Sequence, residues 1–226
     1  AIVAGLASVD GYKLMIIGHQ KGRDIESNIF RNFGMASPEG YRKALRLMRM
    51  AERFKLPILT FIDTSGAYPG IEAEEKGQSE AIAKNLAEMF GIKVPIVAVV
   101  IGEGGSGGAL GIGVADSILM LENSVYSVIS PEGCATILFN DSKKAPDAAR
   151  SLKIDSISLK SFGIIDGIVK EPLGGAHRDL KQASINLKTA VLKEFKKIDK
   201  FEIENLLEKR YNKYRKIGEF FEKEGE

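Results

Sequence analysis

A glycine-rich segment at residues 101–113 is the part of this sequence best suited to chemistry. Five of the seven positions from 102 to 108 are glycine, and they follow an apolar run at residues 94–101. Glycine allows a positive φ and a close approach to the main chain, while the start of a helix adds unpaired N–H groups and a positive dipole end. The pattern therefore predicts backbone N–H donors for a negatively charged oxygen, which is how an oxyanion hole is built without side chains.

Two other kinds of site fit the same glycines less well. A phosphate-binding P-loop needs Gly-Lys followed by Ser or Thr, whereas alanine and leucine follow here. Residues 104–108 do match Gly-x-Ser-x-Gly, the nucleophile elbow of α/β hydrolases, with Ser106 as the candidate nucleophile. Asp155 or Asp166, followed by His177, would complete the triad in the hydrolase order. A serine hydrolase therefore stays an alternative, as does a tight packing turn that binds no ligand.

Composition argues against several classes of protein. The 226 residues include 32 basic and 30 acidic side chains, and the net charge of +2 gives no indication of a nucleic-acid or membrane partner. The single cysteine, Cys134, excludes an internal disulfide and is typical of a reducing compartment. No apolar stretch exceeds the length of a strand, and nothing resembles a signal peptide. Because the chain begins with Ala1 inside a strand pattern, we expect a fragment truncated at its N-terminus.

The hydrophobic patterning predicts an α/β protein with a hairpin at its start. Asp10 and Gly11 form a strong turn signal between strands at residues 2–8 and 12–17. A strand, a glycine-containing loop and a helix then occur twice in succession, and such loops lie at the carboxyl ends of parallel strands, where ligands collect. Further strands are expected at residues 56–63, 94–101, 117–121 and 125–129, and helices at residues 38–54, 78–89, from 131, at 145–152 and from 178 to the end with a break near 199.

Seven sequence blocks, in the right order, resemble the carboxyltransferase α subunit of bacterial and plastid acetyl-CoA carboxylase. They are Gly18–Arg23, Arg31–Met35, Pro38–Ala44, Gly66–Gly70, Gly102–Leu110, Ser130–Cys134 and Glu171–Arg178. The resemblance implies a crotonase-like (ClpP/crotonase) fold, a spiral of ββα units, as a single domain over residues 1–226 with a helical C-terminal extension from about 178 to 226. The sequence departs from the family at Ser65, where proline is usual, and in lacking the N-terminal helical region.

The resemblance also implies a reaction and the residues that serve it. The reaction is the transfer of a carboxyl group from carboxybiotin, carried on a protein, to acetyl-CoA, giving malonyl-CoA for fatty acid biosynthesis. The family's backbone oxyanion hole maps onto Gly107 and Gly108, and no metal is implied in this chain. The loops expected to face carboxybiotin or acyl-CoA contain Gly104, Gly105, Ser106, Gly66, Ala67 and Tyr68.

The partners implied by the resemblance are a carboxyltransferase β subunit in an α2β2 heterotetramer, the biotin carboxyl carrier protein and biotin carboxylase. Neither a membrane nor a nucleic acid is among them, and the expected location is the cytoplasm, or the plastid stroma for a plant or algal chain. A second alternative on the same fold is another acyl-CoA enzyme, a hydratase or isomerase, with Glu103 and Glu132 as paired carboxylates.

The C-terminal helical stretch combines a basic cluster with an apolar stripe. The cluster includes Lys209, Arg210 and Lys213, and the acidic residues interspersed with it argue against nucleic-acid binding. The stripe runs from Leu207 to Phe221 at helical spacing. We expect the basic residues to flank a surface on which subunits pack.

Overall fold

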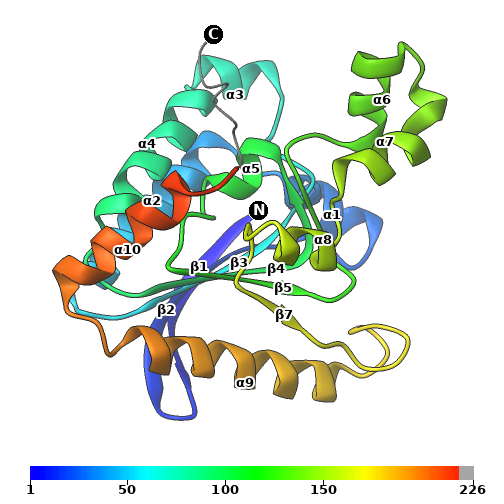
Figure 1. Cartoon of the computed structure of the whole chain (residues 1–226). Helices are drawn as coiled ribbons and strands as arrows, with labels where there is room; N and C mark the ends of the chain where they lie inside the picture. Colours follow the sequence, from blue (N-terminus) through cyan, green and yellow to red (C-terminus); the bar gives the residue numbers. More distant parts are fainter. Residues whose placement is uncertain (219–226) are drawn as a thin grey trace, which may run out of the picture.

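A seven-stranded sheet forms the centre of the structure, a computed structural model that describes residues 1–218 (Figure 1). Six strands follow the order β1-β2-β3-β4-β5-β7, and β6 pairs with β4 away from this path. The first pair, β1 with β2, is antiparallel and the other pairs are parallel. The strands are β1 (Ile2–Val9), β2 (Tyr12–His19), β3 (Ile58–Thr64), β4 (Ile96–Gly105), β5 (Ser117–Leu121), β6 (Val125–Ser127) and β7 (Gly167–Val169).

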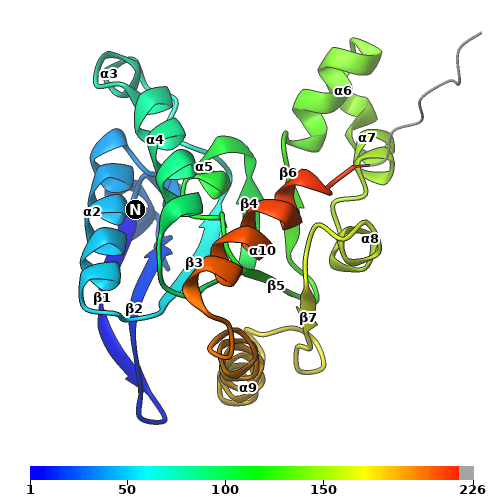
Figure 2. The same ribbon diagram turned by 60° about the vertical axis from the view of Figure 1, so that its left-hand side comes forward.

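Helices cover both faces of this sheet (Figures 1 and 2). None of the helices in the described part of the chain is long and apolar enough to cross a membrane. The helices are α1 (Ile25–Phe30), α2 (Pro38–Arg53), α3 (Ile71–Glu75), α4 (Gln78–Gly91), α5 (Ser106–Leu110), α6 (Pro131–Phe139), α7 (Ala145–Leu152), α8 (Ser156–Ser161), α9 (Leu180–Ile198) and α10 (Ile203–Arg215), with short 3-10 turns η1 (Asn32–Gly34) and η2 (Ser142–Lys144).

The predicted hairpin is confirmed. Asp10 and Gly11 have φ values of 49° and 82°, and positive φ at both central residues is the requirement of the tight turn that matches strand twist. Val9 then pairs with Tyr12, and the register continues to Ile2 opposite His19.

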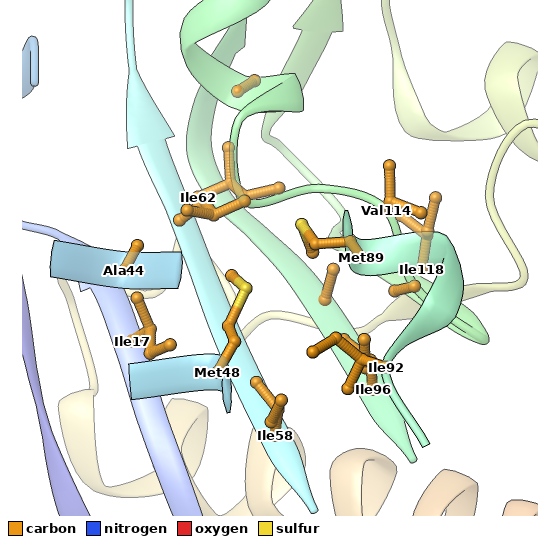
Figure 3. Close-up of a cluster of buried hydrophobic side chains, with 14 of the residues drawn as sticks. Ile17, Ala44, Met48, Ile58, Ile62, Met89, Ile92, Ile96, Val114 and Ile118 are labelled. Atoms are coloured by element: carbon orange, nitrogen blue, oxygen red, sulfur yellow. The ribbon is translucent and has the colours of Figure 1, made fainter. Parts of the chain in front are cut away.

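Two hydrophobic layers hold the helices on the sheet. On one face, Met48 of α2 and Met89 of α4 meet Ile17, Ile58 and other β2–β4 side chains, all of them buried (Figure 3). On the opposite face, α9 places Val191, Phe195 and Ile198 against Leu14, Leu59, Val97 and Val99. Because successive residues of a strand point to opposite faces, a sheet covered on both sides needs nearly continuous apolar strands, as β4 has.

The prediction of an α/β fold is confirmed, and most predicted elements are present with ends shifted by a few residues. Four short elements, α1, α3, α8 and β7, were not predicted, and neither were the 3-10 turns η1 and η2. None of the α1 side chains is buried, and its start is instead defined locally by the side chain of Asp24, which accepts from the backbone N–H of Ser27. Such elements carry no apolar period for sequence analysis to detect.

The glycine segment, residues 102–108, differs most from its prediction. It is not a loop, because β4 continues through Gly105 and α5 begins at the next residue. The first half of β4 pairs with β5, and its last residues pair with Val125–Ser127 of β6. The change of partner gives the extended glycine backbone a hydrogen-bonded ladder, which is why it stays a strand.

The C-terminal helices α9 and α10 lie where they were predicted, although residues 219–226, including Phe221, fall outside the described residues. The prediction for Arg210 was wrong, because it is only 1% exposed. Its guanidinium pairs with Asp116 at 2.7 Å and donates to the carbonyl oxygens of Met89, Ile92 and Val94. Arg210 therefore fastens α10 to the end of α4 and to the strand that follows.

Replacing this arginine tests how much the contact contributes to stability. Arg210→Met should lower the free energy of unfolding by about 3–5 kcal/mol, because Asp116 is left buried without a counter-charge. Urea denaturation measures the loss. The control, Arg215→Met at an exposed position of the same helix, should change stability by less than about 0.5 kcal/mol. Equal effects of the two substitutions would contradict the assigned role.

Candidate functional site

The two strand ends that the sequence singled out meet in space. Thr64, at the end of β3, pairs with Gly104, near the end of β4. A Cβ atom at Gly105 would lie 2.0 Å from the carbonyl oxygen of Ser65, so no other residue type fits there without a shift of the backbone. The glycine segment and residues 65–70, which we call the β3 loop, therefore form one backbone-lined unit.

Helix α5 starts inside this unit. The N–H groups in the first turn of a helix have no intrahelical acceptor, and in α5 these groups belong to Ser106, Gly107 and Gly108. Gly107 is partly exposed and Gly108 is buried against the β3 loop. The predicted donors thus occupy the expected place, at the end of a central parallel strand.

The glycines of the segment serve a different purpose from the one predicted. The left-handed φ, 51°, belongs to Ser106. At Gly108 a Cβ would lie 2.3 Å from the carbonyl carbon of Gly66, whereas at Gly107 it would meet only Ile82, at 3.8 Å. Close approach of two backbones, rather than a positive φ, therefore explains Gly108.

Both parts of the unit are held by side chains that the sequence analysis did not assign to the site. Gln78 of α4 donates to the carbonyl oxygen of Tyr68 at 2.9 Å and so holds the β3 loop. Asn85, two turns further along α4, donates to the carbonyl oxygen of Gly111 at 2.8 Å and so holds the end of α5. Their spacing of seven residues on one helix is the signal that could have indicated a shared role.

A charged cluster lies where the glycine segment begins. The ammonium group of Lys21 is 2.6 Å from Glu103 and 3.1 Å from Asp63, which also accepts from the backbone N–H of Glu103. Partial burial disfavours the charge of Lys21, but the two carboxylates outweigh it and raise the pKa of this lysine. Glu103 is therefore engaged in an ion pair, which does not favour the paired-carboxylate role with Glu132.

The structure does not assemble a serine-hydrolase triad. Ser106 borders an apolar cavity of about 280 Å³, whereas His177 lines a different cavity of about 650 Å³ together with Glu171. His19 is buried, and burial lowers its pKa to about 3. Asp155 caps α8, and Asp166 accepts from the backbone N–H of Ile118.

Within residues 1–218, no group of three or more histidine, cysteine, aspartate or glutamate side chains is placed to hold a metal ion. What the described residues do place together is a set of backbone N–H groups and an apolar cavity. Fixed backbone donors at the start of α5, beside an apolar cavity, stabilise negative charge that develops on an oxygen. Low local polarity strengthens such an interaction relative to water.

Solved structures of other proteins have the same fold. The chain superposes on transcarboxylase 12S with a TM-score of 0.67 at 18% identity, covering 100% of this chain and 39% of that one. It superposes on a Pseudomonas malonate decarboxylase hetero-tetramer with a TM-score of 0.73 at 18% identity, covering 95% and 86%. The fold is that of the crotonase-like carboxyltransferases, as predicted.

Sequence comparison identifies the family within this class. A sequence model described as acetyl co-enzyme A carboxylase carboxyltransferase-like matches residues 1–218. The α subunit of acetyl-coenzyme A carboxylase carboxyl transferase from Fusobacterium nucleatum is 64% identical over 220 residues, which is 97% of this chain and 70% of that protein. The subunit of the same name from Geobacter metallireducens is 59% identical over 222 residues, 98% of this chain and 70% of that protein. The chain belongs to this family, and the predicted resemblance is confirmed.

The contrast between neighbouring glycines gives a direct test of the site geometry. Gly108→Ala should destabilise the protein by about 1–3 kcal/mol, because its Cβ would overlap the backbone of Gly66. Gly107→Ala should leave stability unchanged or slightly raised, because its Cβ has room and alanine favours helix. Thermal and urea unfolding of both variants measure the difference, and equal stability would contradict the close approach.

Proposed function

We propose that this chain is the α half of a carboxyltransferase that moves a carboxyl group from carboxybiotin to acetyl-CoA, giving malonyl-CoA for fatty acid synthesis. The observation that carries the proposal is the backbone-lined unit at the ends of β3 and β4, in a chain of this family. Its residues are Gly66, Ala67 and Tyr68 on the β3 loop and Gly104, Gly105, Ser106, Gly107 and Gly108 on the glycine segment.

In this proposal the catalytic groups are the backbone N–H groups of Gly107 and Gly108. When bound, carboxybiotin would supply the carboxyl group as carbon dioxide and its ureido group as the base for a methyl proton of acetyl-CoA, and the resulting enolate would form the new carbon–carbon bond to that carbon dioxide. The chain then needs no side-chain base, which agrees with the engagement of Glu103 by Lys21. We assign the ureido oxygen of biotin as the ligand of the N–H groups, because charge accumulates there during transfer.

The proposed partners follow from the relatives. The proteins most similar in sequence are named as subunits, and structural neighbours include a malonate decarboxylase hetero-dimer and hetero-tetramer. We propose that a β subunit completes the active site in an α2β2 assembly, and that the biotin carboxyl carrier protein, loaded by biotin carboxylase, delivers the carboxyl group. We place this assembly in the cytoplasm, or in the stroma of a plastid.

Reconstitution tests the reaction itself. The chain alone should form no malonyl-CoA from acetyl-CoA and carboxybiotin, because in this proposal the β subunit completes the active site. Activity should appear when a carboxyltransferase β subunit of a close relative is added, and a coupled spectrophotometric assay of malonyl-CoA measures it. Full activity of the chain alone, or of the β subunit without it, would contradict the proposal.

The backbone donors are tested within that reconstituted complex. In Gly107→Val, the branched side chain stands beside the N–H group and restricts access to it, so kcat should fall by about a hundredfold, as for the loss of one oxyanion donor. The Michaelis constant for acetyl-CoA should change much less. Gly91→Val, at a glycine with nothing within 4 Å of the added Cβ, is the matched control. Near wild-type turnover of an assembled Gly107→Val complex would show that the oxygen is stabilised elsewhere.

A further inference from the structure

Tyr41 of α2 reaches the glycine segment from the hydrophobic core. Its side chain is 0% exposed, and its hydroxyl donates to the carbonyl oxygen of Gly108 at 3.2 Å. The ring lies directly against Gly111, where a Cβ atom would be 2.5 Å from a ring carbon. The tyrosine thus contacts α5 through a hydrogen bond at its middle residue and through packing just after its end.

Asn85 of α4 joins the same contact from a second helix. Its amide nitrogen donates to the carbonyl oxygen of Tyr41 at 3.0 Å and to that of Gly111 at 2.8 Å. The residue is 1% exposed, and its side-chain oxygen has no partner. Tyr41, Asn85 and Gly111 therefore form a closed set of buried contacts beneath α5.

These contacts hold α5 in place through the carbonyl groups of its backbone. A trans peptide is planar, and its carbonyl and N–H bonds point in opposite directions. The carbonyl of Gly107 accepts from the N–H of Gly111 at 3.0 Å, and that bond fixes the peptide whose N–H belongs to Gly108. The bond from Tyr41 holds the carbonyl of the next peptide, whose N–H belongs to Ala109. The bonds from Tyr41 to Gly108 and from Asn85 to Gly111 therefore hold the body of α5, and with it the peptides at its start.

Packing alone does not require these polar atoms. The buried neighbours of Tyr41 on α2 include Ala44 and Met48, and those of Asn85 on α4 include Ala81 and Met89, so both positions belong to apolar helix faces. A buried amide with an unpartnered oxygen is unfavourable compared with an apolar side chain of similar size. Tyr41 donates to the carbonyl oxygen of Gly108, and Asn85 donates to that of Gly111 and to that of Tyr41 itself.

We propose that Tyr41 and Asn85 are positioning residues for carboxyl transfer, and that they hold α5 so that its first N–H groups face the reacting oxygen. The inference rests on the proposed function of Gly107 and Gly108. It extends that function to two helices that do not themselves contact the ligand. Gln78, on the same helix α4, holds the β3 loop in a similar way, because its amide nitrogen donates to the carbonyl oxygens of Tyr68 and Ala36.

The test removes one hydroxyl and nothing else. In the reconstituted complex, Tyr41→Phe should lower kcat by about tenfold, with the Michaelis constant for acetyl-CoA within about twofold of wild type, because only the placement of the donors changes. Tyr214→Phe is the matched control. Its hydroxyl is also partly buried and accepts from the N–H of Ala115 and donates to the carbonyl oxygen of Gly113, two residues that follow α5. Its kcat should equal that of wild type.

Amide hydrogen exchange gives a readout that does not depend on activity. The amide of Gly111, which bonds to Gly107, should exchange about tenfold faster in Tyr41→Phe and at the wild-type rate in Tyr214→Phe. Unchanged exchange and unchanged kcat in Tyr41→Phe would overturn the inference. Equal loss of kcat in both variants would also overturn it, because the effect would then follow general stability. If the wild-type complex transfers no carboxyl group, the proposed function fails, and exchange alone decides whether Tyr41 holds α5.

Discussion

The close approach of two backbones, at the ends of β3 and β4, is the constraint on which the rest of this structure depends. Gly105 and Gly108 lie so near Ser65 and Gly66 that a single added carbon atom would overlap them. Glycine is flexible in the unfolded chain, so a glycine-rich segment is entropically unfavourable to order. Neighbouring elements must therefore hold the glycine segment in its folded conformation.

Hydrogen bonds from a neighbouring strand and from helix α4 hold the glycine segment and the β3 loop in place. The strand ladder with β6 extends the glycine segment as far as Gly105, and Gln78 and Asn85 fasten the β3 loop and the end of α5 to the same helix. Apolar packing of α2 and α4 on the sheet places these side chains (Figure 3). The same contacts place Gly107 at the start of α5 in a partly exposed position.

Electrostatics in this protein serves mainly to join elements. The buried pair of Arg210 with Asp116 fastens α10, and the pairs of Lys21 with Asp63 and Glu103 connect β2 to the start of the glycine segment. In the sequence alone, Arg210 and Glu103 look available for a partner or for chemistry, but in the structure each is already part of an ion pair. Family membership and the backbone geometry together favour a transferase whose charge stabilisation comes from peptide groups.

The sequence by itself determined the α/β class, the hairpin at Asp10, the amphipathic α2 and the family, because turn chemistry, apolar periodicity and ordered motifs are local properties of the chain. It also located Gly107 and Gly108 at the start of a helix. Only the tertiary structure decided that the glycine segment remains a strand as far as Gly105, that Arg210 is buried, and that Tyr41 and Asn85 meet beneath α5. Those facts depend on contacts between residues tens of positions apart, and neither composition nor spacing encodes such distances.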